Sequence, residues 1–145
     1  MTKTAITKKI TGVAVVTPKP PVEVITPPKP NREEVLYGKT YIINPPELEC
    51  PMHITINSVD GKPYEIFINC GHLESHEWIM CVTRLISAIW QSGGDSSFIS
   101  KSMQSIFSPK GGYFIPKGGG RCHGVVSHIG IVIERHSREL STTTL

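Results

Sequence analysis

The chain has 145 residues, of which 39% are hydrophobic and 19% are charged, so it can form one modest domain with a core of its own. The net charge is only +3, and much of the basic excess lies near the N-terminus, at Lys3, Lys8, Lys9, Lys19 and Lys29. A basic tail without a basic face gives little support to nucleic-acid binding, so we expect no direct DNA binding. No apolar run approaches about 20 residues, the length of a membrane span, and the N-terminal region lacks the hydrophobic block of a signal peptide. We therefore expect a cytoplasmic protein without a membrane partner.

Residues 1–33 are predicted to form a flexible, basic leader outside the folded domain. Six prolines fall between Pro18 and Pro30. Proline removes backbone donors and favours an extended polyproline II chain, so this stretch should act as a semi-rigid spacer. The VAVV segment at residues 13–16 has two interpretations: it is part of a solvated tail, or it is a strand that adds to a sheet edge in another chain.

Residues 34–140 are predicted to fold as an α+β domain with a small antiparallel sheet of about three strands and about three helices. The first strand is expected within residues 36–44, which are rich in aromatic and β-branched side chains. Residues 51–59 and 64–69 both alternate apolar with polar side chains, and the Asp60–Gly61 turn between them predicts an antiparallel hairpin. The side chains expected on the buried face are Met52, Ile54, Ile56, Tyr64, Ile66 and Ile68.

Two helices are predicted between His72 and Phe107, with a break at Gly93–Gly94. Gly93 should end the first helix in the left-handed conformation, and Asp95 should cap the start of the second. The apolar residues of the first helix recur at intervals of three and four, which predicts a stripe that packs on the sheet. This stripe comprises Trp78, Cys81, Val82, Leu85, Ile86 and Ile89.

The second helix is expected to end before Ser108–Pro109. Its apolar side chains are Phe98, Ile99, Met103, Ile106 and Phe107. A third helix should begin near Val125 and end between His136 and Glu139, and residues 141–145 should fray.

The segment between the second and third helices is the part of the chain most suggestive of a ligand site. Its glycines and lysines place free backbone amides and positive charge ahead of a helix start, an arrangement that favours phosphate. The candidate phosphate contacts are Lys110, Gly111, Gly112, Lys117, Gly118 and Arg121. Their spacing matches neither a P-loop nor a dinucleotide fingerprint, so a structural turn is the alternative interpretation.

Neither a metal site nor a catalytic constellation is predicted. His72 and His76 are four residues apart, and Cys122–His123 and His128 lie downstream, but no Cys-x-x-Cys pair anchors them. The four cysteines are expected to be free in a reducing cytosol, with Cys81 in the core. No nucleophile lies in a recognisable strand-turn-helix elbow, so no catalytic residue is predicted.

Three residues of the first helix are candidates for a protein interface. Trp90 is expected toward the edge of the apolar face, where an exposed tryptophan would favour a partner. Arg84 and Gln91 fall largely off the apolar stripe.

Five blocks of the chain are YGKTYIIN, MHITINSVDGKPYEIFIN, ESHEWIMCVTRLISAIWQSGGD, FSPKGGYF and IGIVIERH. In this order they closely resemble the C-terminal accessory domain of adenosylcobalamin-dependent (class II) ribonucleotide reductases, which some bacteria and phages encode as a separate small subunit. The resemblance runs from about Val35 to His136. Longer members of the family continue into a cysteine-rich tail that can bind metal or relay reducing equivalents, whereas this sequence ends at STTTL, so we expect no such relay.

The resemblance implies a part in reducing ribonucleotides to deoxyribonucleotides for DNA synthesis. In that family the radical chemistry and the cobalamin site belong to a large barrel, which 145 residues are too few to build. The implied role is therefore a non-catalytic accessory subunit that binds no cofactor itself, with adenosylcobalamin in the large catalytic subunit. Two other classes stay open: an oligomeric module that binds a small phosphorylated nucleotide, and a homo-oligomeric scaffold assembled through Trp90 and the sheet edge.

Overall fold

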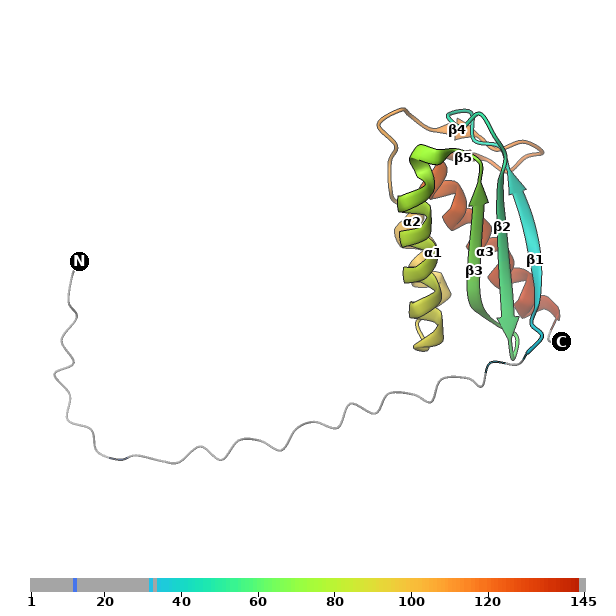
Figure 1. Ribbon diagram of the computed structural model, residues 1–145, viewed down its shortest axis with the longest axis vertical. Helices are drawn as coiled ribbons and strands as arrows, with labels where there is room; N and C mark the ends of the chain where they lie inside the picture. Colours follow the sequence, from blue (N-terminus) through green and yellow to red (C-terminus); the bar gives the residue numbers. More distant parts are fainter. Residues whose placement is uncertain (1–11, 13–31, 33, 144–145) are drawn as a thin grey trace.

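The computed structural model describes residues 12, 32 and 34–143. Residues 34–143 contain a three-stranded sheet, three α-helices and a short two-stranded hairpin (Figure 1). The elements are β1 (Tyr37–Ile43), β2 (Met52–Val59), β3 (Lys62–Cys70), the 3₁₀ helix η1 (Leu73–Ser75), α1 (His76–Gln91), α2 (Ser96–Gln104), β4 (Tyr113–Phe114), β5 (Arg121–Cys122) and α3 (Val125–Thr143). The predicted α+β class is confirmed. Within this described part, no helix is long and apolar enough to cross a membrane. Apart from Gly12 and Arg32, the predicted leader falls outside the described residues, so both interpretations of it stay predictions.

The sheet has the order β1-β2-β3, with antiparallel pairing throughout. Its predicted alternation is confirmed, because Met52, Ile54 and Ile56 of the central strand are completely buried. The intervening side chains of β2 face the side of the sheet away from the helices, where the Thr40 and Thr55 hydroxyl oxygens lie 2.9 Å apart. One face of the sheet therefore belongs to the core, and the other is open.

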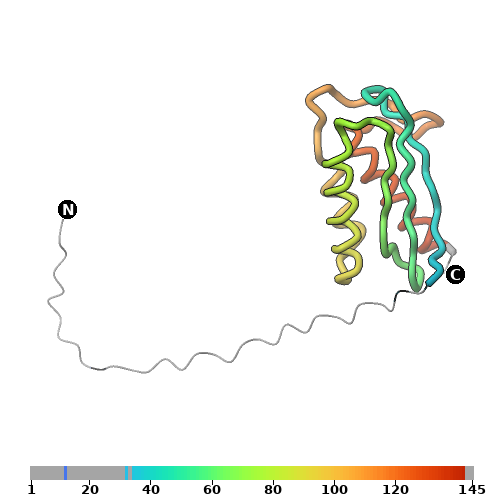
Figure 2. Tube along the Cα trace, viewed as in Figure 1, coloured from blue at the N-terminus to red at the C-terminus, as the bar shows by residue number. Residues whose placement is uncertain are grey.

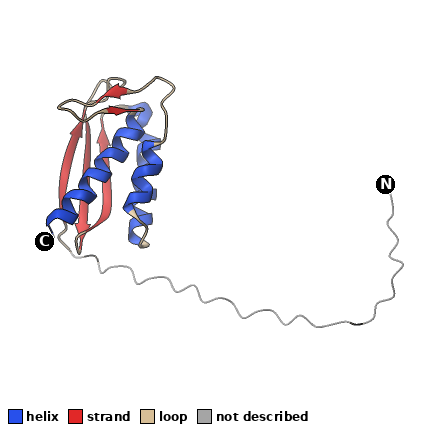
Figure 3. Cartoon of the chain, turned by 180° about the vertical axis from the view of Figure 1, so that it is seen from behind, coloured by secondary structure: helices blue, strands red, loops and turns tan. Residues whose placement is uncertain are grey.

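The helices form a second layer on the buried face of the sheet. Helix α1 lies along β3 (Figure 1), and α3 crosses the sheet from behind while α2 packs on α3 (Figure 3). A Cβ atom at Gly130 of α3 would lie 2.8 Å from the Ser100 carbonyl oxygen and 2.9 Å from Met103 Cβ. Glycine at this position is what lets α2 and α3 approach so closely.

The face that α1 buries differs from the predicted stripe. Its buried residues are Ile79, Thr83, Ile86 and Trp90, which also follow a helical spacing. Three predicted core residues point outward instead: Cys81 is exposed, and Leu85 and Ile89 are 58% and 40% exposed. Apolar side chains surround much of α1, so the sequence is compatible with two different buried faces. Only the face that contacts β3 is buried.

The helix boundaries are partly as predicted. Gly93 has a φ of 84°, and the Asp95 carboxylate accepts a hydrogen bond from the Ser97 backbone N–H at 2.9 Å, so both predicted caps are confirmed. Helix α2 stops at Gln104, and the predicted apolar residues Ile106 and Phe107 follow it in an exposed segment. Phe98 is also exposed, at 70%, because the buried face of α2 comprises Ile99, Ser100 and Met103.

Helix α3 is longer than predicted, because it continues to Thr143. The prediction ended it between His136 and Glu139, where the apolar residues become sparse. Its last turns carry side-chain hydrogen bonds: the Ser141 hydroxyl donates to the Ser137 carbonyl, and the Thr142 hydroxyl donates to the Arg138 carbonyl.

Candidate functional site

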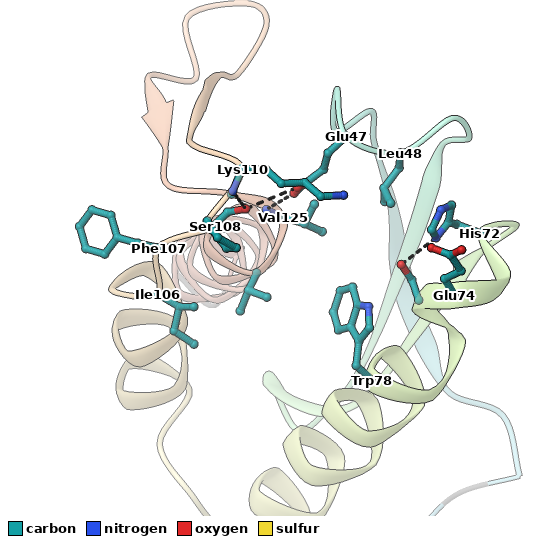
Figure 4. Close-up of a pocket in the computed structure, with 14 residues that line it drawn as sticks. Glu47, Leu48, His72, Glu74, Trp78, Ile106, Phe107, Ser108, Lys110 and Val125 are labelled. Atoms are coloured by element: carbon teal, nitrogen blue, oxygen red, sulfur yellow. Dashed lines mark hydrogen bonds between the residues drawn. The ribbon is translucent and has the colours of Figure 1, made fainter.

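The structure has an apolar cleft of about 340 Å³. The backbone segments that supply its lining residues lie at the end of the domain opposite the start of β1 and the end of α3 (Figure 2). Four segments form it: the loop between β1 and β2, η1 with the start of α1, the segment after α2, and the start of α3 (Figure 4). Its apolar lining consists of Leu48, Trp78, Ile106, Phe107, Val125 and Val126. We call this site the Trp78 cleft.

Trp78 is the largest side chain in the cleft. It belongs to the first turn of α1, which begins directly after η1. Its indole packs partly against the core and points from α1 into the cleft (Figure 4). The prediction placed Trp78 on the core stripe, and the structure places it where the core meets the cleft. A half-buried aromatic ring in this position offers apolar surface to a partner.

Glu47 ties the walls of the cleft together. One carboxylate oxygen accepts a hydrogen bond from the backbone N–H of Val125 at 3.3 Å, at the first residue of α3. The other accepts a hydrogen bond from the Ser108 hydroxyl at 3.4 Å. A carboxylate at a helix N-terminus satisfies a free amide and interacts favourably with the helix dipole. The β1–β2 loop is therefore held against the segment after α2 and against α3.

The glycine- and lysine-rich segment forms two turns rather than one cradle. Lys110 lines the Trp78 cleft, and Gly111, with a φ of 89°, turns the chain back toward Ser108. Lys117 and Gly118 lie beyond β4 at the tip of the hairpin, and Arg121 pairs with Phe114 in the β4–β5 ladder.

Phosphate binding by the six predicted residues stays a prediction, and the arrangement at α3 does not favour it. The prediction relied on free amides at the start of the following helix. There, the first amide of α3 already donates to Glu47, a carboxylate of the same chain. A phosphate would meet that negative charge.

A second depression, a groove of about 750 Å³, runs between β3 and α1. Two of the three predicted interface residues, Arg84 and Gln91, line it. Ser87 lies in the same groove, where its hydroxyl accepts a hydrogen bond from the Ile66 N–H at 3.1 Å. Helix α1 thus covers part of the β3 edge, which would otherwise offer free backbone groups to another chain. An interface role for Arg84 and Gln91 stays a prediction.

Trp90 does not provide the exposed indole that the interface interpretation requires. It is only 5% exposed and belongs to the hydrophobic core, because α1 turns the face with Ile79 and Ile86 toward the sheet. Its indole Nε1 has no hydrogen-bond partner among the described residues. The expectation that Trp90 lies at the edge of the apolar face is therefore wrong.

A partly buried polar network that the sequence analysis missed joins α3 to the sheet. His136 is 1% exposed, and its Nδ1 lies 3.0 Å from the Tyr41 hydroxyl while its Nε2 lies 3.0 Å from the Ser58 hydroxyl. Tyr41 donates to Glu139 Oε2 at 3.2 Å, and Lys39 donates to the same oxygen at 2.9 Å. The available signal was spacing, since His136 continues the stripe formed by Ile129, Val132 and Ile133.

The ionisation of these groups sets the direction of the hydrogen bonds. Burial raises the pKa of Tyr41 to about 12, with a further contribution from the Glu139 charge. Hydrogen bonds from Lys39 and Arg135 lower the pKa of Glu139 to about 2, and burial lowers the pKa of His136. Tyr41 therefore donates to the Glu139 carboxylate and accepts from the Nδ1–H of a neutral His136, whose Nε2 accepts from Ser58. Every group in this network has a hydrogen-bond partner, as the burial of His136 requires.

The remaining histidines that the sequence singled out are dispersed. His72 Nδ1 lies 2.9 Å from the Ser75 hydroxyl, and His128 Nδ1 lies 2.8 Å from the Tyr113 hydroxyl. The His123 ring packs against Phe107 with a centroid distance of 4.0 Å. Among residues 12, 32 and 34–143, no group of three or more His, Cys, Asp or Glu side chains is placed to hold a metal ion.

Comparison with known proteins identifies the family of the chain. The TSCPD domain family matches residues 18–137, which is most of the sequence. The matched range includes the strands, η1, α1 and α2 described above, and α3 as far as residue 137. No curated protein and no solved structure matches the chain at a significant level. The chain therefore belongs to the TSCPD domain family, a family of domains found at the C-terminus of B12-dependent class II ribonucleotide reductases.

Proposed function

We propose that the chain is an accessory subunit of a class II, B12-dependent ribonucleotide reductase. In this role it supports the reduction of ribonucleotides to deoxyribonucleotides for DNA synthesis, while a large catalytic subunit carries the active site. The observation that carries the proposal is the family match over residues 18–137, because the domains of this family are found in these reductases.

Adenosylcobalamin belongs to the catalytic subunit in this proposal. The Trp78 cleft has a volume of about 340 Å³, at the lower end of the range for sites that hold drug-sized ligands. The β3–α1 groove, at about 750 Å³, lies within the same range. Adenosylcobalamin is much larger than such ligands, so neither depression fits it.

The Trp78 cleft is the docking surface that we assign to the catalytic subunit. Ile106 and Phe107 are 48% and 71% exposed beside it, so apolar surface at this end of the domain is available for burial. The hydrogen bonds of Glu47 hold the walls of the cleft in place before a partner arrives. A preorganised surface loses less conformational entropy on binding, which favours affinity.

The rim of the cleft adds charge to this apolar centre. Glu74 lies on the α1 side and Lys110 on the opposite side (Figure 4). A partner segment with an apolar side chain flanked by one basic and one acidic residue would match this surface. The apolar side chain would enter the cleft, the basic residue would face Glu74, and the acidic residue would face Lys110. Such rim charges mainly set orientation and association rate, whereas the buried aromatic anchor supplies most of the affinity.

The nucleotide-binding alternative depends on Lys117 and Arg121, which lie on the β4–β5 hairpin. Isothermal titration calorimetry of the full chain against nucleoside diphosphates and triphosphates tests it. This alternative predicts binding that Lys117→Ala and Arg121→Ala weaken. Absent binding, or binding that neither variant changes, removes it.

Co-purification with the catalytic subunit of a B12-dependent reductase tests the accessory role. The full chain should form a complex with that subunit, and by itself it should show no reductase activity with adenosylcobalamin. Adding the chain should raise the activity or the stability of the catalytic subunit. A catalytic subunit that neither binds the chain nor changes in its presence would contradict the proposal.

A further inference from the structure

Two cysteines from distant parts of the sequence meet at one end of the sheet. The Sγ atoms of Cys50 and Cys70 lie 3.4 Å apart. Cys50 lies in the loop before β2, two residues ahead of its first residue Met52, and Cys70 is the last residue of β3. The β2–β3 register pairs Met52 with Cys70, so the sheet itself brings the two thiols together. A movement of little more than one ångström separates this contact from a disulfide bond, whose S–S distance is about 2.05 Å.

Both thiols are accessible enough to react. Cys50 and Cys70 are each partly exposed, whereas Cys122 is buried with 1% exposure. Cys70 also lines the β3–α1 groove, through which a reactant can approach it. Burial raises the pKa of the Cys70 thiol, which favours its protonated form at neutral pH.

We propose that Cys50 and Cys70 form a reversible dithiol–disulfide couple that exchanges with accessible disulfides. One thiolate attacks the S–S bond of the external disulfide, forms a mixed disulfide and releases one external sulfur. The other cysteine then attacks the protein sulfur of the mixed disulfide, forms the Cys50–Cys70 bond and releases the second external sulfur. Two electrons pass to the external disulfide, and the two thiol protons end on its sulfurs. The couple does not depend on the accessory role proposed above.

Oxidised glutathione is the probe for this couple. The full chain is equilibrated without oxygen in a series of ratios of oxidised to reduced glutathione, and it is then quenched with acid and treated with an alkylating agent. As the ratio rises, the peptides that contain Cys50 and Cys70 should together lose two hydrogen atoms and two alkylation sites, with no glutathione attached to either cysteine. Peptide mapping should find Cys50 joined to Cys70, and excess reduced glutathione should reverse the change.

Three variants distinguish this couple from unspecific oxidation. Cys50→Ser and Cys70→Ser should each abolish the internal bond and leave a glutathione adduct on the remaining cysteine of the pair. Cys81→Ser is the matched control, because Cys81 is exposed on α1, and it should oxidise as the unmodified chain does. Circular dichroism should show that all three variants are folded. If Cys50→Ser or Cys70→Ser does not fold, the corresponding alanine variant is used in its place.

Three results would overturn the proposal. The first is the absence of a Cys50–Cys70 bond across the whole glutathione series. The second is a Cys81→Ser variant that no longer forms the internal disulfide, because the reaction would then depend on the Cys81 thiol. The third is one equivalent of zinc in the purified chain that disappears in both Cys50→Ser and Cys70→Ser, since the pair would then be a metal site.

Discussion

The two ends of α3 are held to the rest of the domain in different ways. At its start, Val125 meets the Glu47 carboxylate beside the apolar Trp78 cleft, which is open to the outside. Near its end, His136 and Tyr41 lie within a polar network in which each group has a partner. The difference indicates that the end of α3 anchors the helix to the sheet, whereas its start leaves surface free for a partner. The predictions below test this division.

Replacing His136 should have the largest effect on stability. His136→Ala removes two hydrogen bonds, leaves Tyr41 and Ser58 without their buried partner and opens a cavity. The free energy of unfolding should fall by about 3 kcal/mol. Urea denaturation measures it, with His53→Ala on the exposed face of β2 as a control that should change it by less than about 0.5 kcal/mol. A loss below about 1 kcal/mol for His136→Ala would mean that the network is not the anchor.

His136 of this network and His128, which lies beside Tyr113, should make stability depend on pH. Burial lowers the pKa values of His136 and His128 below the ordinary value of 6.5, so the unfolded chain takes up protons before the folded chain does. The stability that these two neutral histidines contribute is therefore complete above pH 6.5 and is lost as the pH falls below this value. Glu139, with its pKa lowered to about 2, keeps its contribution until the pH falls below about 4.5.

Urea denaturation at about pH 8 and about pH 5 should therefore show lower stability at the acidic value. His136→Gln retains polar atoms but does not titrate, so it should reduce this difference. A stability that stays constant or rises toward pH 5 would contradict a buried, neutral His136.

Glu47 should have a smaller effect, because it lies at the open end of α3. Glu47→Ala leaves the Val125 amide without its carboxylate partner, and the free energy of unfolding should fall by about 1 kcal/mol. Glu47→Gln keeps an acceptor without the charge and should lose less than the alanine variant. Urea denaturation of both variants checks this order, and equal stability of both with the unmodified chain would show that Glu47 does not hold the cleft.

The smallest effect is expected on the outer surface of α3. Arg138 pairs with Glu134 at 3.3 Å across one helical turn, and both side chains are well exposed. Solvent screening leaves such a pair only about 0.3 kcal/mol, so Arg138→Ala should be almost neutral in the same denaturation measurement. A loss above about 1 kcal/mol would mean that stability is not concentrated in the His136 network.

Local patterns were sufficient to predict much of the fold. Alternation correctly placed Met52, Ile54 and Ile56 on the buried face, because a strand beneath a helical layer exposes alternate residues to opposite environments. Cap chemistry correctly placed the break between α1 and α2. The buried face of α1 could not be chosen in this way, since Leu85 and Ile89 are as apolar as Ile79 and Ile86 and only the position of β3 decides between them.

The candidate site was less predictable because distant residues build it. Glu47 caps α3 from 78 positions away, and no local pattern indicates which carboxylate reaches that helix. The glycine- and lysine-rich segment was correctly expected to contain turns, but the prediction of a free helix start did not include Glu47. Cys50 and Cys70 show the same limit, because only the β2–β3 register brings them together.

Binding of the full chain to the catalytic subunit of a B12-dependent reductase, measured by calorimetry, tests the central claim most directly. Trp78→Ala removes the aromatic anchor of the cleft, while Leu85→Ala on an exposed face of α1 outside the cleft is the matched control. We predict that the unmodified chain and Leu85→Ala bind alike and that Trp78→Ala raises Kd by at least about tenfold. Equal binding by all three would contradict docking through the Trp78 cleft, and no binding by the unmodified chain would contradict the accessory role itself.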